Sequence, residues 1–198
     1  KGLNLAILAN PYVLAAAALA AVVAALVAFS DSAEEAEQKQ EALNRTILAG
    51  QEYEATFAKE IDRLSKERIN DLETQISIRR AEGASVAEIS KLEREKIDVQ
   101  LNALKALKEQ KKEQQVQDRL NAQTAIALGT EEGNAKYKQL TDQVRDRTDA
   151  IKDIESQEKA LRNQIKVLGA QTTADLKKEN EEQVKDAKER QENLKKLT

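Results

Sequence analysis

The chain has 198 residues, of which 34% are charged, 40% hydrophobic and only 3% aromatic, and its net charge is −3. Three Tyr, two Phe and no Trp argue against a large globular core, because aromatic side chains dominate burial in such cores. Cys and His are absent, which excludes disulfides, thiolate metal sites and the most common general base. A chain rich in Ala, Glu, Lys, Leu, Arg and Gln is instead typical of long helices.

Residues 3–29 are uncharged and rich in Ala, which predicts one apolar helix. Asn10 and Pro11 suit the N-cap and first position of a helix. The segment 12–29 would then span about 27 Å, close to the apolar thickness of a membrane. Its small residues recur at spacings that let helices approach closely. The residues that we assign to membrane contact or helix packing are Tyr12, Leu14, Ala17, Leu19, Ala21, Val22, Val23, Ala24, Leu26, Val27, Ala28 and Phe29. A membrane-insertable helix and a helix buried in a helical assembly are both compatible with this pattern.

A seven-residue pattern follows over residues 36–64, with several polar members. Its positions are Ala36, Gln40, Leu43, Ile47, Gly50, Glu54, Phe57, Ile61 and Leu64. Gly83 predicts the end of this helical region, and Ser85 with Glu88 has the spacing of a capping box that begins the next helix. Residues 108–115 contain no apolar side chain, so we expect this stretch to be solvated on every side.

The segment 129–133 predicts a second break, and the most regular heptads of the chain follow it. The apolar positions of this seam are Tyr137, Leu140, Val144, Ile151, Ile154, Leu161, Ile165 and Leu168. Arg147 and Glu158 interrupt the seam. Polar residues at such positions either set register and oligomeric state or bend past a loose seam into solvent. We expect Gly169 to end this helix and Thr173 to cap a last one.

These features predict an all-α chain, in which an Ala-rich apolar helix precedes long coiled-coil-like helices that are either extended or folded into hairpins. We divide it into an apolar helix at 1–30, long amphipathic helices at 31–128 with a break near 83, and a coiled-coil region at 129–198 with a break near 169. Val, Ile and Leu are mixed along the second seam, so dimers, trimers and higher states all stay open.

No motif in the sequence predicts catalysis, a cofactor or a metal. A phosphate-binding GxxxxGK[ST] loop is absent, and neighbouring acids such as Glu181 and Glu182 lie in charged helical runs. The Lys-rich stretch 105–112 is interleaved with Glu and has no aromatic residue nearby, so specific nucleic-acid binding is not expected. We predict a protein that is not an enzyme.

The run Asn10-Pro11-Tyr12-Val13-Leu14, continuing into AAAALAAVVAALVAF and then directly into a long charged helix, resembles tail tape measure proteins of tailed bacteriophages. The resemblance is strongest over residues 10–60 and compositional elsewhere. It implies an internal fragment, in keeping with the absent initial Met, of a virion protein that lies inside the tail tube, sets tail length and helps the genome through the host envelope. It also implies self-association, with a trimer favoured by tail symmetry, contacts with tail tube or tail tip proteins, and contact with the host membrane on ejection.

Two other classes of protein share these features. A membrane-anchored coiled-coil spacer would use residues 3–29 as its anchor, and the residues before Lys1 would identify it. A helical pore-forming toxin also combines long helices with an apolar segment, and a compact monomer in solution would favour it.

Overall fold

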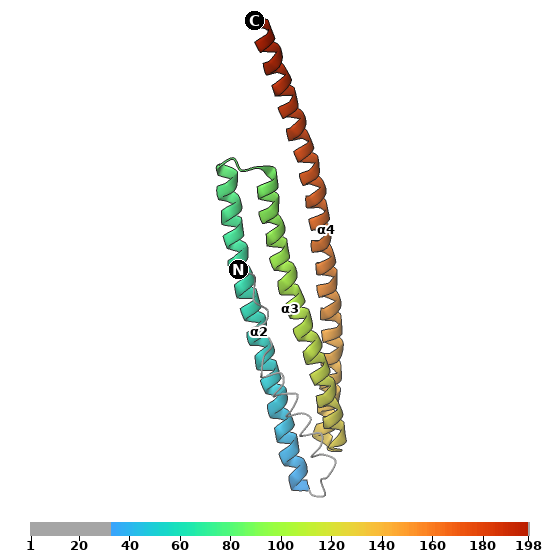
Figure 1. Ribbon diagram of the computed structural model, residues 1–198. Helices are drawn as coiled ribbons and strands as arrows, with labels where there is room; N and C mark the ends of the chain where they lie inside the picture. Colours follow the sequence, from blue (N-terminus) through green and yellow to red (C-terminus); the bar gives the residue numbers. More distant parts are fainter. Residues whose placement is uncertain (1–32, 198) are drawn as a thin grey trace. The chain divides into compact units, whose positions relative to one another are not determined.

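The computed structural model describes residues 33–197, with side chains for residues 36–190, and almost all of these residues are helical (Figure 1). The described residues form three helices: α2 spans Ala33–Ala81, α3 spans Val86–Ala127 and α4 spans Glu131–Leu197. The described residues contain no strand, and the predicted all-α class is confirmed.

The apolar helix predicted at 1–30 lies outside the described residues, and so does every residue assigned to it at positions 12–29. Between residues 33 and 197, no helix contains a stretch that is both long enough and apolar enough to cross a membrane. The predicted transmembrane segment therefore stays a prediction.

The turn between α2 and α3 lies at the predicted break near residue 83. Gly83 has a φ of +73°, a conformation that suits only glycine well, and the Ala84 amide donates to Arg79 O at 2.9 Å across the helix end. The predicted capping box begins α3: the Ser85 amide donates to Glu88 Oε2 at 3.1 Å, and the Glu88 amide donates to Ser85 Oγ at 3.4 Å. These local bonds explain why one helix ends and another begins within a few residues.

The turn between α3 and α4 lies at the second predicted break. Gly129 has a φ of +63°, and its amide donates to Ile126 O at 3.1 Å. Thr130 then caps α4, because its Oγ1 accepts from the Gly133 amide at 2.9 Å. Two acids, Glu131 and Glu132, occupy the first turn of α4, where negative charge is favoured by the helix dipole.

The break predicted near Gly169 does not exist, and α4 continues through it for 67 residues in all. Gly169 is not among the positive-φ glycines of the described chain, and a single helical glycine costs only about 1 kcal/mol relative to Ala. Thr173 does not cap a new helix, since its Oγ1 donates back to Gly169 O at 2.9 Å inside α4.

The chain forms two compact units, and each of the three helices contributes to both. In the described part, unit 1 comprises residues 33–64 and 102–158, and unit 2 comprises residues 65–101 and 159–197. The predicted division, at 1–30, 31–128 and 129–198, instead followed the order of the chain. Helices that fold back as hairpins bring distant segments together, so the units do not follow the order of the chain.

In unit 1, α3 runs antiparallel to α2, and α4 runs parallel to α2. Glu54 lies beside Lys111 and Gly50 beside Gln114, which makes α2 and α3 antiparallel; Asn44 with Glu132 and Glu54 with Arg147 make α2 and α4 parallel. An apolar cluster forms at one end of the unit from Leu43, Ile47, Ala122, Ala125 and Leu140, with Leu128 packed against it. Leu43 and Leu140 are each only 1% exposed, and burying a leucine contributes about 1.5–3 kcal/mol.

In unit 2, α2 and α3 form an antiparallel hairpin with an apolar interior. Its buried side chains include Leu72, Ile76, Ile97 and Leu101. The charged pairs Arg68–Glu95, Lys96–Glu73 and Arg80–Glu93 connect the two helices along the edges of this interior. Helix α4 joins the unit through a hydrogen bond between the hydroxyls of Thr172 and Ser90.

Candidate functional site

The interior of unit 1 contains a line of polar side chains along α3. Its members are three or four residues apart, so they share one face of the helix. They are Gln110, Gln114, Asp118, Asn121 and Thr124, and all are buried. We call them the polar line. The expectation that residues 108–115 are solvated on every side was wrong, because Gln110 and Gln114 of this stretch are buried where α3 packs against other helices.

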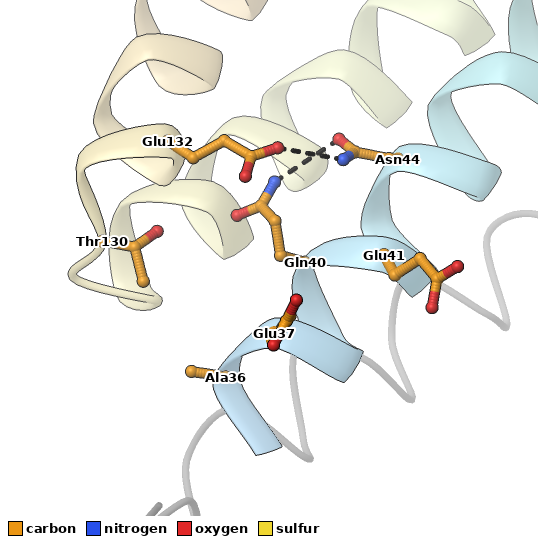
Figure 2. A pocket seen from close by; sticks show the side chains of 7 residues that line it. All are labelled: Ala36, Glu37, Gln40, Glu41, Asn44, Thr130 and Glu132. Carbon is orange, nitrogen blue, oxygen red and sulfur yellow. Dashed lines mark hydrogen bonds between the residues drawn. The ribbon is translucent and has the colours of Figure 1, made fainter. Parts of the chain in front are cut away.

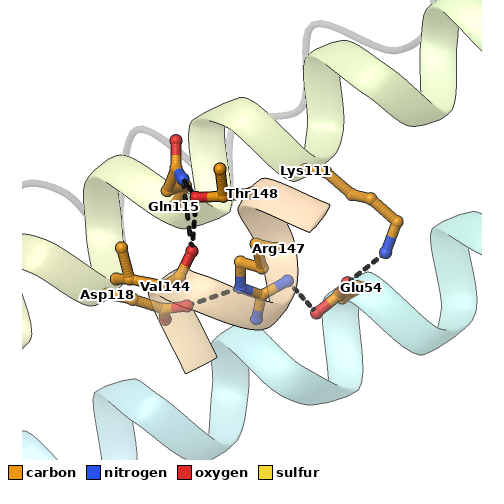
Figure 3. Close-up of polar contacts among 7 residues, drawn as sticks. All are labelled: Glu54, Lys111, Gln115, Asp118, Val144, Arg147 and Thr148. Carbon is orange, nitrogen blue, oxygen red and sulfur yellow. Dashed lines mark hydrogen bonds and ion pairs between the residues drawn. The ribbon is translucent and has the colours of Figure 1, made fainter. Parts of the chain in front are cut away.

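Arg147 of α4 lies at the centre of an ion cluster that joins all three helices (Figure 3). Its Nη1 donates to Glu54 Oε2 on α2 at 2.6 Å, and its Nε donates to Asp118 Oδ2 on α3. Lys111 of α3 approaches the other oxygen of Glu54 at 3.4 Å. The side chains of Arg147 and Asp118 are only 11% and 4% exposed, so these charges interact with little screening by water. Glu54, Lys111, Asp118 and Arg147 are called the ion cluster below.

Burial changes the protonation balance of the ion cluster. It raises the pKa of Asp118 above the ordinary value for a carboxyl, although the hydrogen bond from Arg147 acts in the opposite direction. For Arg147, burial lowers the pKa, but the hydrogen bonds to Glu54 and Asp118 outweigh it and the pKa is raised overall. The guanidinium thus stays charged, whereas burial disfavours the charged form of Asp118.

A second buried pair lies further along the same helices. Lys108 Nζ donates to Glu158 Oε2 at 2.7 Å, and the two side chains are 15% and 8% exposed. Among the described residues, the other carboxylate oxygen of Glu158 has no hydrogen-bond partner, and neither amide atom of Gln110 has one. Unit 1 therefore contains buried polar atoms whose desolvation no group in the described part of the chain compensates.

The predicted α4 seam is divided between the two units. In unit 1, Leu140 and Ile154 are buried, Val144 and Ile151 are partly buried, and Tyr137 is exposed. In unit 2, the remaining members are partly buried: Leu161, Ile165 and Leu168. The two polar interruptions, Arg147 and Glu158, do not bend into solvent but form the buried ion pairs described above.

An open pocket of about 500 Å³ lies elsewhere in unit 1, between the start of α2 and the α3–α4 turn (Figure 2). It is lined by Ala36, Glu37, Gln40, Glu41, Asn44, Thr130 and Glu132. Its acids face solvent and two of them have partners: Glu132 accepts from Asn44 at 3.1 Å, and Glu41 accepts from Arg45 at 2.8 Å. The pocket offers no convergent set of free groups for a reaction. Nor do the described residues hold any group of three or more acids placed to bind a metal ion.

The ion cluster can fix the alignment of three helices. Arg147 meets carboxylates from two other helices, and its planar guanidinium satisfies both only in one position. A shift of α4 by one residue would move it about 1.5 Å and separate these atoms. This is the role that polar residues at core positions have in coiled coils, where they specify register at some cost in stability.

Glu54 and Arg147 lie on the predicted helix seams, but the seams alone do not pair them, and Lys108, Lys111 and Asp118 were not predicted to be buried. The spacing of apolar residues along α3 could have predicted that these three residues are at least partly buried. Continuing the three-and-four spacing of Ile97, Leu101 and Leu104 through the polar stretch leads to Lys108, Lys111 and Asp118. Opposite charges on predicted seams then indicate buried pairs.

Comparisons of the chain with protein-family models, with curated proteins and with solved structures gave no match.

Proposed function

We propose that this chain is part of a tail tape measure protein of a tailed bacteriophage. In this role it is a structural, non-catalytic component inside the tail tube, it sets tail length, and it helps deliver the genome through the host envelope. The observation that carries the proposal is the apolar run at 10–29 followed directly by long charged helices.

The described helices support this role by their physical character. An α-helix has a fixed rise of about 1.5 Å per residue, so each of α2, α3 and α4, with 49, 42 and 67 residues, has a defined length. The ion cluster supports it as well, because it sets helix alignment and needs no ligand. The partners proposed are other copies of the chain, as a trimer, and tail tube or tip proteins, with the host membrane contacted by residues 12–29 on ejection.

The decisive experiment changes the length of the helical region in the phage that encodes it. Deleting residues 163–197 in frame should shorten the tail by about 50 Å, at 1.5 Å for each of the lost residues. The matched control replaces the same residues with an unrelated helical sequence of equal length, and the tail should keep its length. Electron microscopy of purified particles measures both. If the deletion leaves tail length unchanged, the chain does not set tail length.

Lipid vesicles separate the proposal from the other two classes. The full chain should bind vesicles through residues 12–29, and Val22→Lys with Val23→Asp should abolish this binding, since charged residues oppose membrane insertion by about 2.5–3.5 kcal/mol each. Release of the vesicle contents by the isolated chain would favour a pore-forming toxin. Stable vesicle binding together with an unchanged tail would favour a membrane-anchored spacer.

A further inference from the structure

We propose that the two turns of this chain are hinges, and that the hairpins open into one continuous helix over residues 33–197 when Gly83 and Gly129 change from positive to helical φ. The open helix associates with further copies of the chain. This goes beyond the proposed function, because it concerns how the chain changes shape in whatever particle carries it.

The turns themselves are suited to such a change. Each depends on one glycine at positive φ, with values of +73° and +63°, and a Cβ at either position would meet nothing within 4 Å. Glycine adopts helical φ as readily as positive φ. The turn bonds, such as that from the Ala84 amide to Arg79 O, would be replaced by ordinary helical bonds, so backbone hydrogen bonds are not lost on opening.

A third glycine, Gly133, is needed only in the hairpin form of the chain. Gly133 is buried at the start of α4, and a Cβ there would lie 2.4 Å from the backbone oxygen of Ala125 at the end of α3. The two helix ends can approach this closely only because residue 133 has no side chain. A continuous helix would place no such demand on positions 83, 129 or 133, where glycine is a poor helix former.

The interior of unit 1 favours opening more than an apolar interior would. Closure leaves both amide atoms of Gln110 and one oxygen of Glu158 without partners, and water would satisfy them in the open form. The ion cluster would likewise recover its hydration. Opening therefore exposes a surface that is already polar along α3.

Opening also uncovers apolar side chains that need a new partner. Leu43, Ile61, Leu72 and Leu140 are each at most 1% exposed in the hairpins. They lie on α2 and α4, where the three-and-four spacing that suits coiled coils is clearest. A second copy presents the same spacing, so we assign further copies of this chain as the partner. The open helix would be on the order of 250 Å long at 1.5 Å per residue.

Spin labels can measure opening in the full chain, because it contains no Cys of its own. The chain is kept in mild detergent on account of its apolar segment. Labels at the exposed positions Glu113 and Asp149 report on the α3–α4 hairpin of unit 1. Neighbouring helix axes lie about 8–10 Å apart, whereas a continuous helix would separate these positions by about 54 Å. Labels at Asp71 and Arg94, both exposed, report in the same way on the α2–α3 hairpin of unit 2.

Alanine substitutions at the hinges should shift the populations. Gly129→Ala with Gly133→Ala should raise the long-distance population of the first label pair roughly tenfold for each substitution, and Gly83→Ala should do the same for the second pair. The matched control is Gly169→Ala inside α4, where a Cβ meets nothing within 4 Å, and both distances should stay short. Light scattering should show a larger oligomer for the hinge variants alone.

Two results would overturn the hinge proposal: distances that stay short in the hinge variants, or a loss of helical circular dichroism in place of lengthening. Neither depends on tail length. If the chain opens but its shortening leaves tail length unchanged, the hinge proposal stands and the proposed role in setting tail length is wrong. If the chain stays closed but sets tail length, that role stands and the hinge proposal is wrong.

Discussion

The two units use the same three helices but place their charges differently. In unit 2 the interior is apolar, and its charged pairs lie at the edges, where Arg80 and Glu93 are 59% and 29% exposed. In unit 1 the charges lie inside, where Arg147 and Asp118 are 11% and 4% exposed. Both units are built from the same three helices, so burial is what distinguishes the two kinds of ion pair.

Burial changes what an ion pair contributes: little to the free energy of unfolding in either place, but a penalty against wrong helix arrangements when it is buried. Exposed pairs contribute about 0–1 kcal/mol because water and salt screen them. Buried pairs often add little net stability either, but they penalise any arrangement that leaves one charge alone. Unit 2 is therefore held together mainly by apolar burial, whereas in unit 1 buried charged side chains fix the alignment of the helices.

The largest effect is expected from removing the central cation of the ion cluster. Arg147→Met should lower the free energy of unfolding by about 3–5 kcal/mol, because Asp118, only 4% exposed, would lose its ion-pair partner, whereas the more exposed Glu54 would keep Lys111. Urea unfolding followed by circular dichroism measures the loss. The matched control, Arg80→Met in unit 2, should cost less than about 1 kcal/mol. Equal losses in the two variants would contradict the distinction between the units.

Unit 2 should respond most strongly to a cavity. Leu72 is fully buried there, and Leu72→Ala should lower the free energy of unfolding by about 3 kcal/mol through lost burial and the cavity left behind. Ile78→Ala on the same helix is the control, since Ile78 is 51% exposed and should change stability by about 0.5 kcal/mol or less. Hydrogen exchange should locate the loss at α2 and α3 of unit 2. A small effect at Leu72 would show that this interior does not carry the stability of the unit.

Much of the fold could be predicted from local signals. The break at Gly83, the capping box of Ser85 and Glu88, and the break at 129–133 all depend on residues close in sequence, and the structure contains each. The burial of Leu43, Ile47, Phe57 and Ile61 also follows from their spacing. Gly169 misled the prediction because glycine only weakens a helix, and the local turn bonds that end α2 at Gly83 are lacking there.

The ion cluster could not be predicted by the same means. Which charge meets which depends on the hairpin alignment, and this alignment pairs Glu54 with residues 57 and 93 positions further along the chain. Polar composition at 108–115 indicates solvation when the helix is considered alone. It indicates a buried network only when charges on the other two helices are placed opposite.

A smaller effect, of opposite sign, is expected at the polar line. Gln110 is 5% exposed and neither of its amide atoms has a partner between residues 33 and 197, so Gln110→Leu should raise the free energy of unfolding by about 1 kcal/mol. Gln75→Leu at an exposed position of α2 is the matched control and should have almost no effect. The same measurement of urea unfolding applies. Destabilisation by Gln110→Leu would mean that water or another group satisfies this amide.

The smallest effect concerns the charge of Asp118 and appears as a pH dependence. Because burial raises the pKa of Asp118, the folded chain takes up this proton at higher pH than the unfolded chain does. The ionised carboxylate therefore lowers stability above the raised pKa, and this penalty is relieved as the pH falls through that pKa towards the unfolded value.

Asp118→Asn removes the charge but keeps an oxygen that can accept from Arg147 Nε. At neutral pH the variant should be at least as stable as the unaltered chain, and the difference should shrink as the pH is lowered into the range where carboxyls titrate. Unfolding midpoints in urea across this range measure the difference, and the carboxyl chemical shift of Asp118 gives its titration directly. If Asp118→Asn instead destabilises the chain at neutral pH and matches it in acid, the attraction of Arg147 outweighs burial. Unit 1 would then be held together by its charges, as well as aligned by them.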